Sequence, residues 1–142
     1  MIPQRINLIL YSTLAVIICY IDRVNISVAI IPMQEQFGWS DSQVGFIFSS
    51  FYLGYMLTMA LGGYLSDKFG GKLVLGWGVV LWSIFTMLTP LAAHNGFFAL
   101  FFIRVLMGIG EGVTFPAWHS LYARWIPFNE RTRAIAFTNS GV

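Results

Sequence analysis

Residues 97–112 read FFALFFIRVLMGIGEG. Crossing a bilayer takes about 20 mostly apolar residues in a helix, because the hydrocarbon core is about 30 Å thick and each residue rises about 1.5 Å. The apolar character continues to Trp125, so the sequence predicts a membrane-spanning helix over residues 97–125, with Pro116 as a kink inside it. Arg104 and Glu111 interrupt the run, and either charge would be costly if left unpaired at mid-bilayer.

The rest of the chain has the same character. Of its 142 residues, 57% are apolar and 10% charged, whereas a soluble domain carries about 25% charged residues. Pro32 and Pro90 are expected to end two further helices, and Ser40 with Asp41 offers N-cap chemistry for another. The predicted fold is all-α, with four transmembrane helices and the start of a fifth that is cut off at Val142. The helices are expected over residues 6–31, 44–64, 73–89, 97–125 and, incomplete, 132–142.

Several functional classes lose support from composition and motifs. The net charge is +2 and forms no basic stripe, which argues against a nucleic-acid partner. The single cysteine, Cys19, lies in an apolar run without metal-ligand spacing, and His94 and His119 are isolated. No nucleophile–base pair is visible. We therefore expect no enzyme activity, no cofactor and no metal.

Positive charge predicts the orientation in the membrane. Cytoplasmic links of membrane proteins carry an excess of Lys and Arg. The links over residues 32–43 and 90–96 hold none. The predicted N-terminus, 2–3 link and 4–5 link are therefore cytoplasmic. Six of the eight basic residues lie there: Arg5, Lys68, Lys72, Arg124, Arg131 and Arg133.

Four charges lie inside predicted spans, namely Asp22, Arg23, Arg104 and Glu111. Such residues normally face the bundle interior, pair with one another and mark the route of a solute or proton. Asp22 and Arg23 are adjacent and point about 100° apart, so one is expected to face a cavity and the other a neighbouring helix. The alternative is that all four only hold the bundle together as buried ion pairs.

The fourth predicted helix carries a polar stripe beside a stripe of small residues. Arg104 and Glu111 are seven positions apart, which returns them to within about 20° of one face and about 10.5 Å apart along the axis. Gly108 and Gly112 form a small-xxx-small pair that lets another helix approach closely.

Two of these segments resemble a known superfamily. Residues 63–72 read GYLSDKFGGK and resemble the cytoplasmic signature between helices 2 and 3 of the major facilitator superfamily. Residues 104–112 resemble its helix-4 motif. Further motifs are similar to the narrower anion:cation symporter family, which includes sialin, vesicular glutamate carriers, phosphate carriers and sugar-acid permeases. These are YIDRVNIS at residues 20–27, Phe115-Pro116 after Glu111-Gly112, Trp125-Ile-Pro127 and Glu130-Arg131.

The resemblance implies roles for individual residues. Asp22 and Glu111 match membrane carboxylates implicated in proton coupling, and Arg23 and Arg104 match arginines that bind the anion or hold the carboxylates. Cavity-lining positions are matched by Tyr20 and Tyr55. The cytoplasmic signature supplies the gating residues Asp67, Lys68, Gly63 and Gly70. In the family this aspartate pairs with the other half of the transporter; here a local partner such as Arg124 or Arg131 is expected.

The sequence therefore predicts the N-terminal part of a secondary active transporter, whose C-terminal half is a missing partner. It would move a small organic or inorganic anion with protons or sodium across a lipid bilayer by alternating access. One alternative is another facilitator subfamily that moves a neutral sugar or a drug. A second is a non-transporting four-helix membrane protein, against which the start of a fifth span argues. The sequence does not indicate the substrate, the coupling ion or the membrane.

Overall fold

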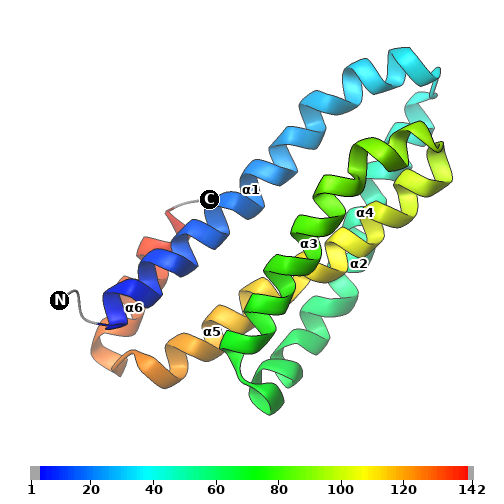
Figure 1. Ribbon diagram of the computed structural model, residues 1–142. Coiled ribbons are helices and arrows are strands. Elements are labelled where there is room, and N and C mark those ends of the chain that lie inside the picture. Colours follow the sequence, from blue (N-terminus) through cyan, green and yellow to red (C-terminus); the bar gives the residue numbers. More distant parts are fainter. Residues whose placement is uncertain (1–3, 141–142) are drawn as a thin grey trace.

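The computed structural model describes residues 4–140, and this part of the chain is all-α (Figure 1). Four stretches are long and apolar enough to cross a membrane, with α4 and α5 together forming the fourth. The last two residues of the predicted 132–142 helix lie outside the described part. The helices are α1 (Gln4–Phe37), α2 (Asp41–Phe69), α3 (Gly71–His94), α4 (Phe97–Gly112), α5 (Thr114–Trp125) and α6 (Phe128–Asn139).

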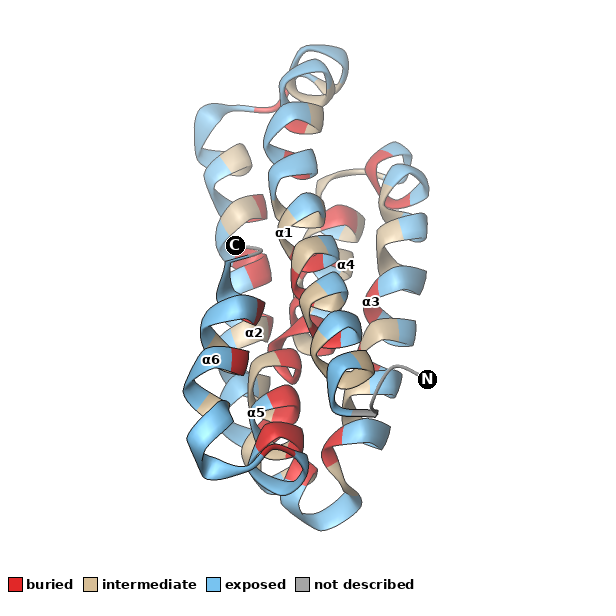
Figure 2. Ribbon diagram, turned by 90° about the vertical axis from the view of Figure 1, so that its left-hand side faces the viewer, coloured by how far each residue is buried: buried red, intermediate tan, exposed pale blue. Residues whose placement is uncertain are grey.

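The long helices alternate in direction and form an antiparallel bundle (Figure 1). The closest packing joins α4 to α2 and α3, while α1 contacts α6 along the half of α1 that begins the chain. Buried positions gather on α5 and in the middle of the bundle, and the outer faces of the helices are exposed (Figure 2). Large apolar side chains are common on these outer faces, as expected where lipid replaces water as the solvent.

Two predicted helix ends are wrong, because both helices continue through their prolines. Pro32 lies inside α1, which extends to Phe37, and Pro90 lies inside α3, which extends to His94. A proline removes one backbone hydrogen bond, but membrane helices tolerate this because neighbouring helices and local adjustments satisfy the freed carbonyl. The residues expected as a polar link, 34–36, form the last turn of α1.

Two further helix boundaries do not follow from the apolar pattern. Ser40 caps α2 in a capping box with Gln43, as the N-cap prediction requires. The predicted 97–125 helix is interrupted at Val113, which separates α4 from α5. Pro116 therefore sits in the first turn of α5, where a proline costs no intrahelical hydrogen bond. The break places Glu111 in the last turn of α4.

Glycines bring α2 and α4 into backbone contact. A Cβ atom on Gly108 would collide with the carbonyl oxygen of Phe51, and one on Gly112 would collide with Thr58 Oγ1. From the other helix, a Cβ on Gly54 would meet the carbonyl oxygen of Val105. The close approach predicted for Gly108 and Gly112 is thus confirmed, and α2 is the helix that approaches.

The start of the predicted fifth span is α6, which turns back along α1. Tyr122 and Thr138 share a buried hydrogen bond of 2.6 Å between their hydroxyl oxygens. Thr13 of α1 donates to the same Thr138 hydroxyl at 3.5 Å. These contacts join α5, α6 and α1 on one side of the bundle.

Candidate functional site

The intramembrane charges meet between α1 and α4. Arg23 Nε donates to Glu111 Oε1 at 2.6 Å, and the Glu111 side chain is only 1% exposed. Arg104 shares a face of α4 with Glu111, but the carboxylate pairs with α1 instead. The pair therefore ties the first helix to the fourth, in a place where a lone charge would be costly.

Asp22 points to a different helix from Arg23, as the 100° offset predicts. Thr86 of α3 lies with its hydroxyl 3.4 Å from Asp22 Oδ2 and can donate to it. A cavity of about 140 Å³ lies between α1, α3 and α4. Its polar lining residues are Asp22, Asn25, Thr86, Thr89 and Arg104.

Arg104 is the most buried cation of the site, with 3% of its surface exposed. Its Nη1 lies 3.2 Å from the sulfur of Met107, a weak acceptor. No carboxylate of the described residues lies within ion-pair distance of it, and its Nε has no hydrogen-bond partner there. A guanidinium carries five donors and is always charged. Arg104 is thus an electrostatically unsatisfied cation beside the cavity.

Aromatic rings surround the Arg23 guanidinium. Its central carbon lies 5.2 Å from the ring centroid of Tyr20 and 4.7 Å from that of Tyr55. Both tyrosines therefore contact the predicted anion-binding arginine, but neither lines the cavity of about 140 Å³, contrary to the prediction. The structure adds Phe51, at 5.2 Å from Arg23, which the sequence analysis did not single out. Its spacing of four residues from Tyr55 puts both on one face of α2, and this is the signal that could have found it.

The residues predicted to form the gate lie at the C-terminal end of α2. Arg124 donates from Nη2 to the Asp67 carbonyl oxygen at 3.3 Å and approaches its carboxylate at 3.9 Å. Arg124 is thus the local partner of Asp67; Arg131 instead donates to the Ala123 carbonyl at 2.9 Å. Lys68 lies beside the rings of Tyr64 and Phe69 in its own helix.

The two predicted gating glycines differ in what their positions require. Gly70 is the single non-helical residue between α2 and α3 and has φ +89°, a conformation that favours glycine. A Cβ atom on Gly63 would meet nothing within 4 Å. Sterics thus account for glycine at position 70 and not at position 63.

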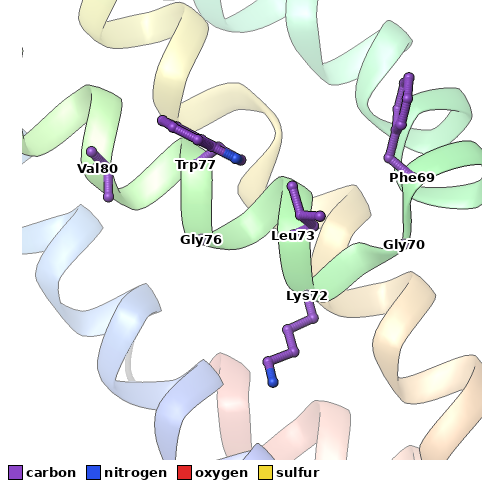
Figure 3. Close-up of a pocket in the computed structure, with 7 residues that line it drawn as sticks. All are labelled: Phe69, Gly70, Lys72, Leu73, Gly76, Trp77 and Val80. Atoms are coloured by element: carbon purple, nitrogen blue, oxygen red, sulfur yellow. The ribbon is translucent and has the colours of Figure 1, made fainter.

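A second hollow of the described surface lies away from these charges. It is a groove of about 740 Å³ along α3, lined by Phe69, Gly70, Lys72, Leu73, Gly76, Trp77 and Val80 (Figure 3). Lys72 is its only charged lining residue, and its amine points away from Trp77 and Phe69 (Figure 3). Trp77, Leu73 and Phe69 are more than half exposed. An open apolar groove on a membrane helix is a surface for lipid or for another helix, so the small polar cavity is the better candidate site.

Comparisons with known proteins identify the family of the chain. A sequence profile of the Major Facilitator Superfamily matches residues 12–142. Similar proteins include the probable anion transporter 4, chloroplastic, of Oryza sativa subsp. japonica, which is 51% identical over 99% of this chain and 24% of its own length. Two others come from Arabidopsis thaliana: the ascorbate transporter, chloroplastic (49% identical, 99% and 26% covered), and the sodium-dependent phosphate transport protein 1, chloroplastic (46%, 99% and 27%). The chain spans about a quarter of the length of these relatives.

Proposed function

Since the chain belongs to the Major Facilitator Superfamily, we propose that it forms part of a secondary active transporter for a small anion. The observation that carries this proposal is Arg104, a buried cation with no carboxylate partner among the described residues, which lines a cavity together with four other polar residues. An anion entering the cavity would supply the missing charge. Relatives named as transporters of anions, ascorbate and phosphate support the same substrate class.

Arg23 is the second proposed anion contact. Its Nε is held by Glu111, while its Nη2 is buried without a hydrogen-bond partner in the described part of the chain. A substrate carboxylate or phosphate can take two guanidinium donors at once, which makes arginine well suited to bind it. The incoming anion would thus share or replace Glu111 on Arg23.

The proposed coupling follows from this competition. When Glu111 is charged it holds Arg23 and ties α1 to α4, and when it takes up a proton the ion pair is lost. Asp22 lines the same cavity as Arg104 without forming an ion pair with it, so its protonation would remove a negative charge near that arginine. Protonation of either carboxylate would therefore weaken the electrostatic links between the helices. In alternating access, loss of these links would free the helices to rock around the bound anion. A sodium ion bound at the carboxylates would neutralise their charge in the same way as a proton.

Ligand-induced stabilisation tests the substrate class. A ligand that binds only the folded protein raises its stability by about 2.7 kcal/mol at 100 times its Kd. Phosphate, ascorbate and other small anions are expected to raise the unfolding temperature of the full-length protein in detergent. The shift should vanish in Arg104→Ala and fall in Arg23→Ala.

The matched control is Arg5→Ala, because the Arg5 side chain is 55% exposed and forms an exposed ion pair with Glu130 at 3.9 Å. It should keep the full shift. Stabilisation by a neutral sugar or drug that survives both Arg23→Ala and Arg104→Ala would instead favour the other facilitator subfamily and reject the anion proposal.

For the orientation, we propose that the N-terminus and the 2–3 and 4–5 links face the cytoplasmic side. Lys72 and Asn95 are exposed at opposite ends of α3. Lys72→Cys and Asn95→Cys, each in a Cys19→Ala background, can be labelled with a membrane-impermeant maleimide in sealed right-side-out vesicles. The Asn95→Cys variant should react at once and the Lys72→Cys variant only after permeabilisation. The reverse order would overturn the orientation.

The same labelling tests the proposed gate of Asp67, Lys68, Gly63 and Gly70. The Asp67–Arg124 contact is exposed, and such pairs contribute about 0–1 kcal/mol to stability. Asp67→Asn is therefore expected to leave the unfolding temperature nearly unchanged. It should instead speed the labelling of Asn25→Cys, a cavity position, from the cytoplasmic side. An unchanged labelling rate would remove Asp67 from the gate.

A further inference from the structure

The ring of Phe51 lies close to the buried Arg104 and to the half-buried Arg23. The guanidinium carbon of Arg23 is 5.2 Å from its centroid and that of Arg104 is 5.1 Å from it. A cation within about 6 Å of an aromatic face is attracted by the negative face of the ring. One side chain of α2 therefore touches a cation of α1 and a cation of α4.

Phe51 is held firmly in this place. It is 2% exposed, and its ring stacks on that of Tyr55, with the centroids 5.9 Å apart and the planes at 27°. Its carbonyl oxygen lies where a side chain on Gly108 would be. The glycine contact that brings α2 onto α4 thus also fixes the ring between the two charged helices.

The two arginines need such a contact to different degrees. Arg23 has Glu111 as its partner, whereas Arg104 has only the weak Met107 sulfur acceptor and the Phe51 ring among the described residues. A like charge nearby adds repulsion to the cost of burial. The ring compensates part of that cost without neutralising either guanidinium, so both remain available to an anion.

We propose that Phe51 is a positioning residue for the anion site, holding Arg23 and Arg104 by cation–π contacts on one ring. When Glu111 releases Arg23, the rings of Phe51, Tyr20 and Tyr55 keep its guanidinium in place. When no anion is bound, Phe51 holds Arg104 beside the cavity. This inference rests on the proposed function, since the site it organises is the proposed anion site.

Progressive fluorination of the Phe51 ring tests this inference. Each added fluorine weakens the negative face of the ring while its shape is nearly kept, so folding is not at risk as it would be in Phe51→Ala. The full-length protein carrying mono-, di- or trifluorophenylalanine at position 51 should show KM for phosphate rising stepwise, by about tenfold over the series. The maximal rate should change much less.

The matched control is Phe48, one turn earlier on α2, which packs among apolar side chains. The same fluorinated residues at position 48 should leave KM unchanged. In an Arg104→Lys background, which keeps the charge but loses the planar guanidinium, the fluorine dependence at position 51 should be smaller. Equal responses at positions 48 and 51, or none at either, would reduce Phe51 to a packing residue and overturn the inference.

A second readout separates this inference from the proposed function. The unfolding temperature of the purified protein without substrate should fall stepwise with fluorination at position 51 and stay constant at position 48. If it does so while no anion is transported by any variant, the cation–π contacts stand and the anion function fails. If neither the unfolding temperature nor KM changes with fluorination at position 51 while the wild-type protein transports anions, the inference about Phe51 alone fails.

Discussion

Glu111→Gln is expected to abolish ion-driven anion uptake by the full-length protein in proteoliposomes. Glutamine keeps the shape of the side chain but removes the charge that holds Arg23 at 2.6 Å, leaving that half-buried cation without its carboxylate. Breaking one partner of a buried pair costs about 3–5 kcal/mol. We expect a loss of folding stability toward the lower end of this range, because the Arg23 side chain is 18% exposed and the aromatic rings around it remain. The measurements are gradient-driven uptake and the midpoint of unfolding.

The control for this prediction is Glu35→Gln, since Glu35 is exposed near the end of α1 and pairs with no cation of the described residues. It should transport and unfold like the wild type. Asp22→Asn should also lose coupling, with a smaller loss of stability, because the hydrogen bond of Asp22 within the described part of the chain is the 3.4 Å contact with Thr86 and no ion pair is lost. If both Glu111→Gln and Asp22→Asn kept proton-driven uptake intact, neither carboxylate could be a coupling residue.

The second large effect is expected from a single methyl group. In Gly108→Ala the new Cβ would lie on the carbonyl oxygen of Phe51 and 2.9 Å from the backbone nitrogen of Tyr55. Backbone atoms cannot turn aside as a side chain can, so α2 and α4 must separate. Overpacking of this kind costs about 1–3 kcal/mol or more. The unfolding midpoint in detergent should fall accordingly, and Phe51 should lose its place between the arginines.

Gly45→Ala is the matched control on α2, because a Cβ atom there would meet nothing within 4 Å. Alanine is the better helix former by about 0.5–1 kcal/mol, so this variant should be unchanged or slightly more stable. Equal stability of Gly108→Ala and Gly45→Ala would mean that the close approach of the two helices does not exist in the folded protein.

Much of the fold could be predicted from periodicity and composition. The four apolar stretches, the Ser40 cap and the Gly108–Gly112 stripe all depend on local sequence, and the structure contains them. The continuation of two helices through Pro32 and Pro90 could not be predicted in this way, because the effect of a proline depends on what else satisfies the freed carbonyl. Likewise, the break at Val113 replaces the kink expected at Pro116, although no glycine or proline occupies position 113 itself.

The residues of the charged site could be predicted from the sequence, but the contacts between them could not. Helical geometry placed Arg104 and Glu111 on one face and turned Asp22 away from Arg23, since those relations hold within one helix. Which helix lies opposite is a matter of tertiary packing, so the Arg23–Glu111 pair could not be derived. Phe51 is one of thirteen phenylalanines, and only its position between two arginines distinguishes it.

Uptake by the full-length protein in proteoliposomes tests the central claim most directly, namely that the buried arginines recognise a transported anion. Radiolabelled phosphate and ascorbate are supplied beside a neutral sugar, under an imposed proton or sodium gradient. The account predicts saturable anion uptake that is competed by other anions, lost in Arg104→Ala and retained in Arg5→Ala. Uptake of the neutral sugar alone, or anion uptake that survives Arg23→Ala and Arg104→Ala together, would contradict it.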